Sequence, residues 1–147
     1  MSAAAVKKYF TPEEANQALP LVRAIVTDIV RQFRDVQERK ERLERIRRPK
    51  NSAREGTDPY SEEVAQIEDE LEKDAATLQG YIDELGKLGV QLKDFVRGLV
   101  DFPSLMDGRE VYLCWLLGED EVTHWHELDA GFQGRQSLLA GSVENEI

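Results

Sequence analysis

The sequence lacks the features that mark several large classes of protein. One cysteine in 147 residues cannot form a disulfide within the chain. No apolar run approaches the ~18 residues that a membrane-spanning helix needs, and no charged-then-apolar leader precedes Tyr9. These absences predict a cytoplasmic protein with no membrane association.

Positive charge is outnumbered by negative charge, with 19 Lys and Arg against 29 Asp and Glu. The net charge of -10 opposes general binding to nucleic acid or to anionic membranes. The exception is the segment 39–54, where eight basic residues stand against two acidic ones. This segment leaves open a contact with RNA or an acidic partner, but it has no aromatic residue for base stacking, so we expect nucleic-acid binding to be weak.

Short motifs of the common enzyme classes are missing as well. The chain contains no G-x-S-x-G, no H-E-x-x-H and no C-x-x-C. Its glycines match neither the phosphate loop nor the dinucleotide fingerprint. Acidic residues are too frequent for any two of them to be singled out as a general acid and base. We therefore predict no catalytic residue and favour a protein that is not an enzyme.

Helical signals occupy the first half of the chain, which we expect to form one domain over residues 1–147. The TPEE motif at residues 11–14 is typical of a helix start, with a threonine cap, a proline at the first position and a glutamate three residues after the cap. Apolar residues then recur at steps of three and four, and no helix breaker stands before Pro49. This pattern predicts a helix over residues 11–48.

A polar, turn-forming stretch at residues 49–58 separates this helix from a second one, predicted over residues 59–88. The second helix carries a matching apolar stripe and ends before Gly89, a residue suited to a left-handed cap. The wide parts of the two stripes lie at the start of the first helix and the end of the second. An antiparallel hairpin brings them together, with the basic residues at its tip.

The length of this hairpin predicts a homodimer through the helical arm. At 1.5 Å per residue the arm is roughly 45 to 50 Å long, more than the remaining chain can cover. Apolar residues continue toward the tip at Val36, Leu43, Val64 and Ile67. A second copy could pack along them, and a different protein partner is left open.

After Gly89 the apolar pattern changes from a helical to an alternating period. Short segments rich in strand formers, separated by glycine-containing turns, predict an antiparallel β-meander over residues 89–138. Residues 139–147 are expected to form a loose tail. The predicted fold class is α+β: a long, coiled-coil-like helical hairpin with a small C-terminal sheet packed on its base.

The rarest residue types gather in this C-terminal segment. His124 and His126 are two residues apart, so on a strand both imidazoles point to the same face. Together with Cys114 and Glu127 they form a ligand set suited to zinc or another transition metal. The alternative is a buried thiol beside half-exposed sheet histidines. Strand register decides between the two, and the sequence does not set it.

A second candidate site contains Gly131, Gly134 and Arg135. Two glycines three apart allow a tight backbone with N–H groups that, beside a guanidinium, could hold a phosphate or carboxylate. Arg109 is a further basic candidate for this ligand. In the alternative, Arg135 is structural and pairs with one of three carboxylates: Glu127, Asp129 or Asp101.

Trp115 and Trp125 complete the candidate ligand-binding set, because their rings could stack on a planar ligand; the alternative is that both are core residues. The leading hypothesis is a non-enzymatic protein that self-associates and presents the sheet to a ligand or partner. A small metalloprotein using the Cys/His cluster is the alternative. Binding of RNA or an acidic partner at the hairpin tip is a second alternative.

Three segments resemble a known family: YFTPEEANQALPLV, LGVQLKDFVRGLVDFP and GREVYLCWLLGEDEVTHWHELDAGFQGR. They are similar to an uncharacterised bacterial family, domain of unknown function 2203. The resemblance covers nearly the whole chain. It implies a shared fold unit and a bacterial origin, and it implies no activity.

Overall fold

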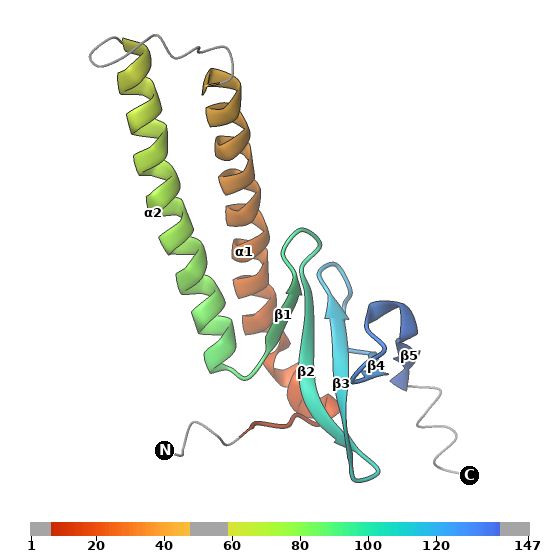
Figure 1. Ribbon diagram of the computed structural model, residues 1–147. Coiled ribbons are helices and arrows are strands. Elements are labelled where there is room, and N and C mark those ends of the chain that lie inside the picture. Colours follow the sequence, from red (N-terminus) through yellow and green to blue (C-terminus); the bar gives the residue numbers. More distant parts are fainter. Residues whose placement is uncertain (1–6, 48–58, 139–147) are drawn as a thin grey trace.

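The structure is a computed structural model that describes residues 7–47 and 59–138 (Figure 1). Two helices, α1 (Pro12–Arg47) and α2 (Pro59–Lys87), pack on each other and are followed by a five-stranded sheet. The predicted α+β class is therefore confirmed. The predicted tip loop at 49–58 and the tail at 139–147 lie outside the described residues.

The start of α1 has the predicted capping geometry. The Thr11 hydroxyl accepts a hydrogen bond from the Glu14 amide at 3.1 Å, and the Glu14 carboxylate accepts one from the Thr11 amide at 3.0 Å. α2 ends at Lys87, and Gly89 follows with a φ of 90°. This is the left-handed region that favours glycine after a helix. Neither helix contains an apolar stretch long enough to cross a membrane.

The outer part of the hairpin is closed by contacts between its own two helices. Val36, Leu43 and Ile67 are 6%, 7% and 4% exposed. Ion pairs cross from basic side chains of α1 to acidic ones of α2: Arg39 with Glu70 and Asp74, Arg42 with Glu63, and Arg47 with Glu68. Three of the apolar side chains that motivated the dimer are thus covered within one chain, and the homodimer stays a prediction.

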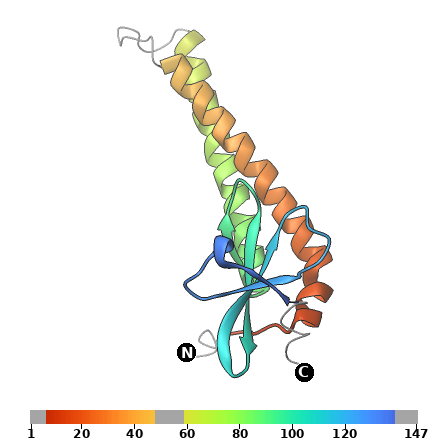
Figure 2. The same cartoon turned by 90° about the vertical axis from the view of Figure 1, so that its right-hand side faces the viewer.

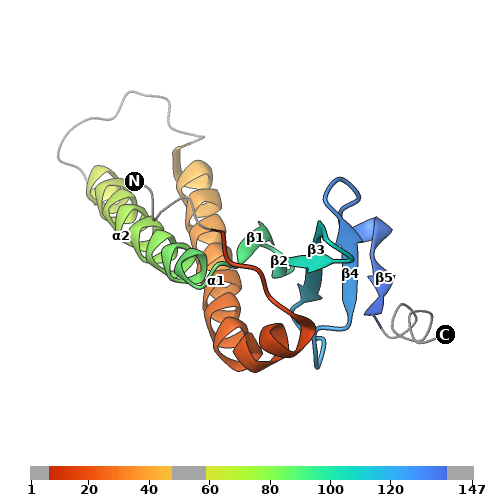
Figure 3. The same ribbon diagram turned by 90° about the horizontal axis from the view of Figure 1, so that it is seen from below.

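The sheet is a meander, as predicted. Its antiparallel strands are β1 (Gln91–Asp94), β2 (Leu99–Met106), β3 (Arg109–Leu116), β4 (His124–Glu127) and β5 (Gln136–Ser137), in spatial order β1-β2-β3-β4-β5. From below, the sheet extends away from α1, with β1 nearest the helices (Figure 3). The far half of the arm projects beyond the sheet (Figure 2).

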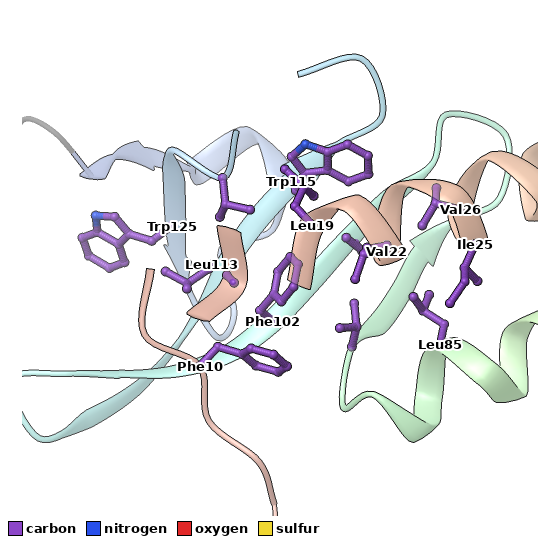
Figure 4. Close-up of a cluster of buried hydrophobic side chains, with 14 of the residues drawn as sticks. Phe10, Leu19, Val22, Ile25, Val26, Leu85, Phe102, Leu113, Trp115 and Trp125 are labelled. Atoms are coloured by element: carbon purple, nitrogen blue, oxygen red, sulfur yellow. The ribbon is translucent and has the colours of Figure 1, made fainter. Parts of the chain in front are cut away.

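One face of the sheet packs on the base of the hairpin (Figure 4). Phe102 of β2 and Leu113 and Trp115 of β3 are fully buried in this core. Phe10, just before α1, packs edge-on against Phe102 with 5.1 Å between ring centroids. Because side chains alternate along a strand, the residues between these core positions point to the opposite, outer face of the sheet.

α1 also fixes the connection between β3 and β4. The Asn16 amide oxygen accepts a hydrogen bond from the Val122 amide at 2.7 Å. The Arg23 guanidinium donates to the Asp120 carbonyl at 3.0 Å, and the Trp115 indole donates to the Glu119 carbonyl at 3.0 Å. The backbone of this connection is therefore held from two sides.

Candidate metal centre

Three side chains from three neighbouring strands meet on the outer face of the sheet. They are Asp101 on β2, Cys114 on β3 and His126 on β4, and their ligand atoms all lie within 4.8 Å of one another. Asp101 is the direct cross-strand partner of Cys114. The three residues are 3%, 0% and 2% exposed, so the cluster is removed from bulk water.

Hydrogen bonds fix the orientation of the His126 ring. Its Nδ1 atom lies 2.7 Å from the Glu127 carbonyl oxygen, which can only accept, so Nδ1 must carry a proton. Its Nε2 atom lies 3.0 Å from Oδ1 of Asp101. Two acceptors would repel each other at this separation, so a hydrogen bond between them requires one proton, carried by either Nε2 or Oδ1, and the pair that shares it is neutral as a whole.

Burial dominates the electrostatics of the other two groups. It raises the pKa of Asp101, against hydrogen bonds from His126 and Cys114 that favour the carboxylate. Burial likewise raises the pKa of the Cys114 thiol from 9.0 to about 11, and the neighbouring Asp101 adds to this while Arg135 opposes it. The thiol therefore keeps its proton at neutral pH when no metal is bound.

This arrangement does not match a cysteine nucleophile with its base. Such a nucleophile needs a lowered pKa and a ring nitrogen placed to take the thiol proton. Here the pKa of the Cys114 thiol is raised, and both nitrogens of His126 already have partners. Asp101, Cys114 and His126 can instead form a buried hydrogen-bonded cluster, or they can hold a metal ion that replaces the protons of that cluster.

Arg135 lies at the edge of this cluster. Its Nη1 atom is 3.9 Å from the Cys114 sulfur and 3.2 Å from Oε1 of Glu119, and Nη2 bonds the other Glu119 oxygen. The expectation that a structural Arg135 would pair with Glu127, Asp129 or Asp101 is wrong. The carboxylate partner of Arg135 is Glu119, because the β3–β4 connection lies beside Cys114. In the predicted anion cradle at residues 131–135, the Gly134 and Arg135 amides donate within the turn to the carbonyls of Gly131 and Phe132, and anion binding there stays a prediction.

Other candidate residues lie apart from the cluster. His124 is the cross-strand partner of Cys114, but its Nδ1 atom bonds the Thr123 hydroxyl at 3.0 Å. Glu127 forms an ion pair with Arg109. Trp115 and Trp125, which are 0% and 8% exposed, belong to the core on the inner face of the sheet.

Sequence reasoning did not find Asp101 as a partner of the sulfur and imidazole groups. A signal existed, because Asp101 is the one charged residue in the apolar run at residues 99–103. A charge in such a run indicates a buried polar contact. Glu119 had no comparable signal, since it is one of three adjacent carboxylates in the turn at residues 119–121.

Comparison with known proteins places the chain in a family. The model of an uncharacterized conserved protein family, DUF2203, matches residues 8–138. The chain belongs to this family. No curated protein and no solved structure matches it. The DUF2203 match includes Asp101, Cys114 and His126 together with Glu119 and Arg135, so the whole cluster lies within the family unit.

Proposed function

We propose that this DUF2203 protein binds one transition-metal ion, with zinc as the best fit, through Asp101, Cys114 and His126. The observation that carries the proposal is the convergence of a thiol, an imidazole and a carboxylate within 4.8 Å at a buried place. Sulfur and imidazole together favour zinc over magnesium or calcium, which prefer oxygen ligands.

The histidine is oriented as metal-binding histidines are. Such residues donate the N–H of one ring nitrogen to a carbonyl or carboxylate, which fixes the tautomer and leaves the other nitrogen for the metal. In His126 the Nδ1 atom makes this contact with the Glu127 carbonyl at 2.7 Å. Nε2, which faces Asp101, is then the ligand atom.

Charge balance also supports an ion at this place. Without metal, the Asp101–His126 pair is neutral and the Cys114 thiol is protonated. A divalent ion would replace the proton between Asp101 and His126 and the proton on sulfur. The site would then hold two negative ligands, one neutral imidazole and one doubly positive ion, so its net charge stays zero. A buried site tolerates such an exchange better than the gain of a charge.

The distances need only small adjustment. Zinc lies ~2.3 Å from sulfur and ~2.0 to 2.2 Å from imidazole nitrogen or carboxylate oxygen, so tetrahedral ligand atoms stand roughly 3.3 to 3.7 Å apart. Nε2 and Oδ1 are 3.0 Å apart, and all the ligand atoms lie within 4.8 Å. The fourth position of the ion would be taken by water or by the second oxygen of Asp101.

The role that fits best is non-enzymatic. An ion bound by β2, β3 and β4 would fasten three strands of a small sheet and stabilise the native state by mass action. The proposal is tested by metal analysis of protein purified without a histidine tag, together with competition against a chromophoric zinc chelator. We expect about one equivalent of zinc.

Matched variants locate the ion. Cys114→Ser and His126→Gln should each remove the zinc, because each loses a ligand atom. His124→Gln is the control: it alters a histidine on the same strand and the same face, outside the cluster. It should retain the metal. Zinc that is absent from the wild type, or that is lost from His124→Gln instead of His126→Gln, would overturn the proposal.

Self-association through the arm is a second candidate function, supported by charge. Within the described residues, several exposed basic side chains of α1 and acidic ones of α2 form no ion pair, although exposed acidic side chains in the same stretch of α1 lack one as well. The basic ones are Arg31, Arg34, Lys40 and Arg45; the acidic ones are Glu62, Glu72 and Glu84 on α2, and Asp35, Glu38 and Glu41 in that stretch of α1. In a two-fold pair of arms, α1 of one copy could face α2 of the other. Sedimentation equilibrium at low and high salt tests this proposal. A dimer that dissociates with salt supports it, and a monomer at both salt concentrations up to high micromolar protein contradicts it.

A further inference from the structure

We propose that Arg135 donates a hydrogen bond to the metal-bound sulfur of Cys114 and that Glu119 holds the guanidinium in that position. The inference rests on the proposed metal site and goes one step beyond it. It assigns Arg135 and Glu119 as positioning residues that set how firmly the sulfur is retained as a ligand.

The geometry is already present without metal. Nη1 of Arg135 lies 3.9 Å from the Cys114 sulfur, within the range of a hydrogen bond to this large atom. The Arg135 side chain is 16% exposed and the sulfur is fully buried, so little water competes for the contact. The guanidinium donor is already charged, and when the thiol proton is replaced by a metal the sulfur gains negative charge as well, so the N–H···S contact becomes stronger.

Besides the sulfur, two groups hold the guanidinium. Glu119 binds it through both carboxylate oxygens, and Oε1 of Glu119 also accepts the Leu116 amide at 2.9 Å. The Phe132 ring lies 4.5 Å below the Arg135 guanidinium carbon. Because the backbone of Glu119 is tied to Trp115, the guanidinium cannot drift from the sulfur without breaking a fixed contact.

The geometry explains why both members of the pair are needed. A lone arginine beside the site would add a positive charge that repels the incoming ion. The Glu119 carboxylate cancels this charge at long range, while the N–H group still reaches the sulfur. Hydrogen bonds from groups that surround a metal site typically change metal affinity by about 10- to 100-fold.

A purely structural role for Arg135 predicts different behaviour. In that case the Arg135–Glu119 pair would only tie the β4–β5 connection to the β3–β4 connection, and its loss would lower stability without touching the metal. Arg97 offers a matched control, because its guanidinium also lies on the Phe132 ring, at 5.0 Å, and also pairs with a carboxylate, that of Asp94. No contact joins Arg97 to the sulfur among the described residues.

The experiment uses the full chain loaded with Co²⁺, whose sulfur-to-cobalt charge-transfer band reports the electron density on the sulfur. A hydrogen bond lowers the energy of the sulfur lone pair, so its loss should shift this band to longer wavelength. We expect the shift in Arg135→Met, together with about 10- to 100-fold weaker Co²⁺ and Zn²⁺ binding. The ligand-field bands should keep their positions, because the ligands are unchanged.

Three further variants separate a folding defect from the loss of the hydrogen bond. Arg135→Lys keeps the charge and should recover part of the affinity, whereas Glu119→Gln should reproduce a weaker form of the Arg135→Met shift. Arg97→Met should leave both band and affinity unchanged. A wild type that binds no Co²⁺ overturns the metal site and this inference together. If the wild type binds Co²⁺ but Arg135→Met shows the same band and affinity, this inference alone is overturned. It is also overturned if Arg135→Lys and Glu119→Gln both match the wild type.

Discussion

The buried thiol of Cys114 should make the metal-free protein lose stability at alkaline pH. Its pKa rises from 9.0 to about 11, chiefly because of burial, so the folded state binds the thiol proton more tightly than the unfolded chain does. The resulting stability is complete below the unfolded pKa and is lost as the pH rises through the folded one. At about 1.4 kcal/mol per pH unit, the interval from pH 9 to 11 corresponds to about 3 kcal/mol.

The variant Cys114→Ser isolates this effect, because lysines and tyrosines that titrate in the same interval contribute to both proteins alike. Unfolding by denaturant, with a chelator and a reductant present, can be followed by the fluorescence of Trp115 and Trp125. The free energy of unfolding of wild type relative to Cys114→Ser should fall by about 2 kcal/mol between pH 8 and pH 11, because the folded thiol is only half ionised at pH 11. A difference that is the same at both pH values would refute the reasoning.

Three further predictions concern the fold. Leu43→Asp places a charge where the side chain is only 7% exposed, so it should destabilise the arm by several kcal/mol in denaturant unfolding. Ala65→Asp, on the exposed face of α2, should leave the free energy of unfolding nearly unchanged in the same assay. Gly98→Ala should cost at least about 2 kcal/mol, because φ is 77° and a Cβ would lie 2.8 Å from the Cβ of Leu117. Gly80→Ala in α2 meets nothing and should stabilise by about 0.5 to 1 kcal/mol in the same assay. Thr11→Ala removes the cap of α1 and should lower the free energy of unfolding by about 1 kcal/mol; an unchanged value would contradict the role of the capping box.

Local signals explain why the architecture could be predicted from the sequence. The capping motif at residues 11–14 marks the start of α1, and Gly89 marks the end of α2, because these residue types favour the backbone geometry of a helix end. The change from helical to alternating apolar spacing marks the start of the sheet near residue 90. Short connections between consecutive strands then favour a meander. Each of these features depends on residues close together in the chain.

The candidate site depends instead on strand register, which such local features do not determine. A one-residue slip exchanges the two faces of a strand. The sequence does not distinguish His124 from His126 as a candidate metal ligand. In the structure His126 reaches Asp101, while His124 bonds Thr123. Glu119 likewise becomes the partner of Arg135 because α1 holds the connection beside Cys114, a contact between distant parts of the chain.

X-ray absorption at the zinc edge of tag-free, zinc-loaded protein tests the central claim most directly. The proposed centre predicts one sulfur scatterer at ~2.3 Å and two or three nitrogen or oxygen scatterers at ~2.0 to 2.2 Å. The sulfur contribution should vanish in Cys114→Ser and persist in His124→Gln. Bound zinc surrounded only by nitrogen and oxygen in the wild type would contradict the account, as would a wild type that retains no zinc.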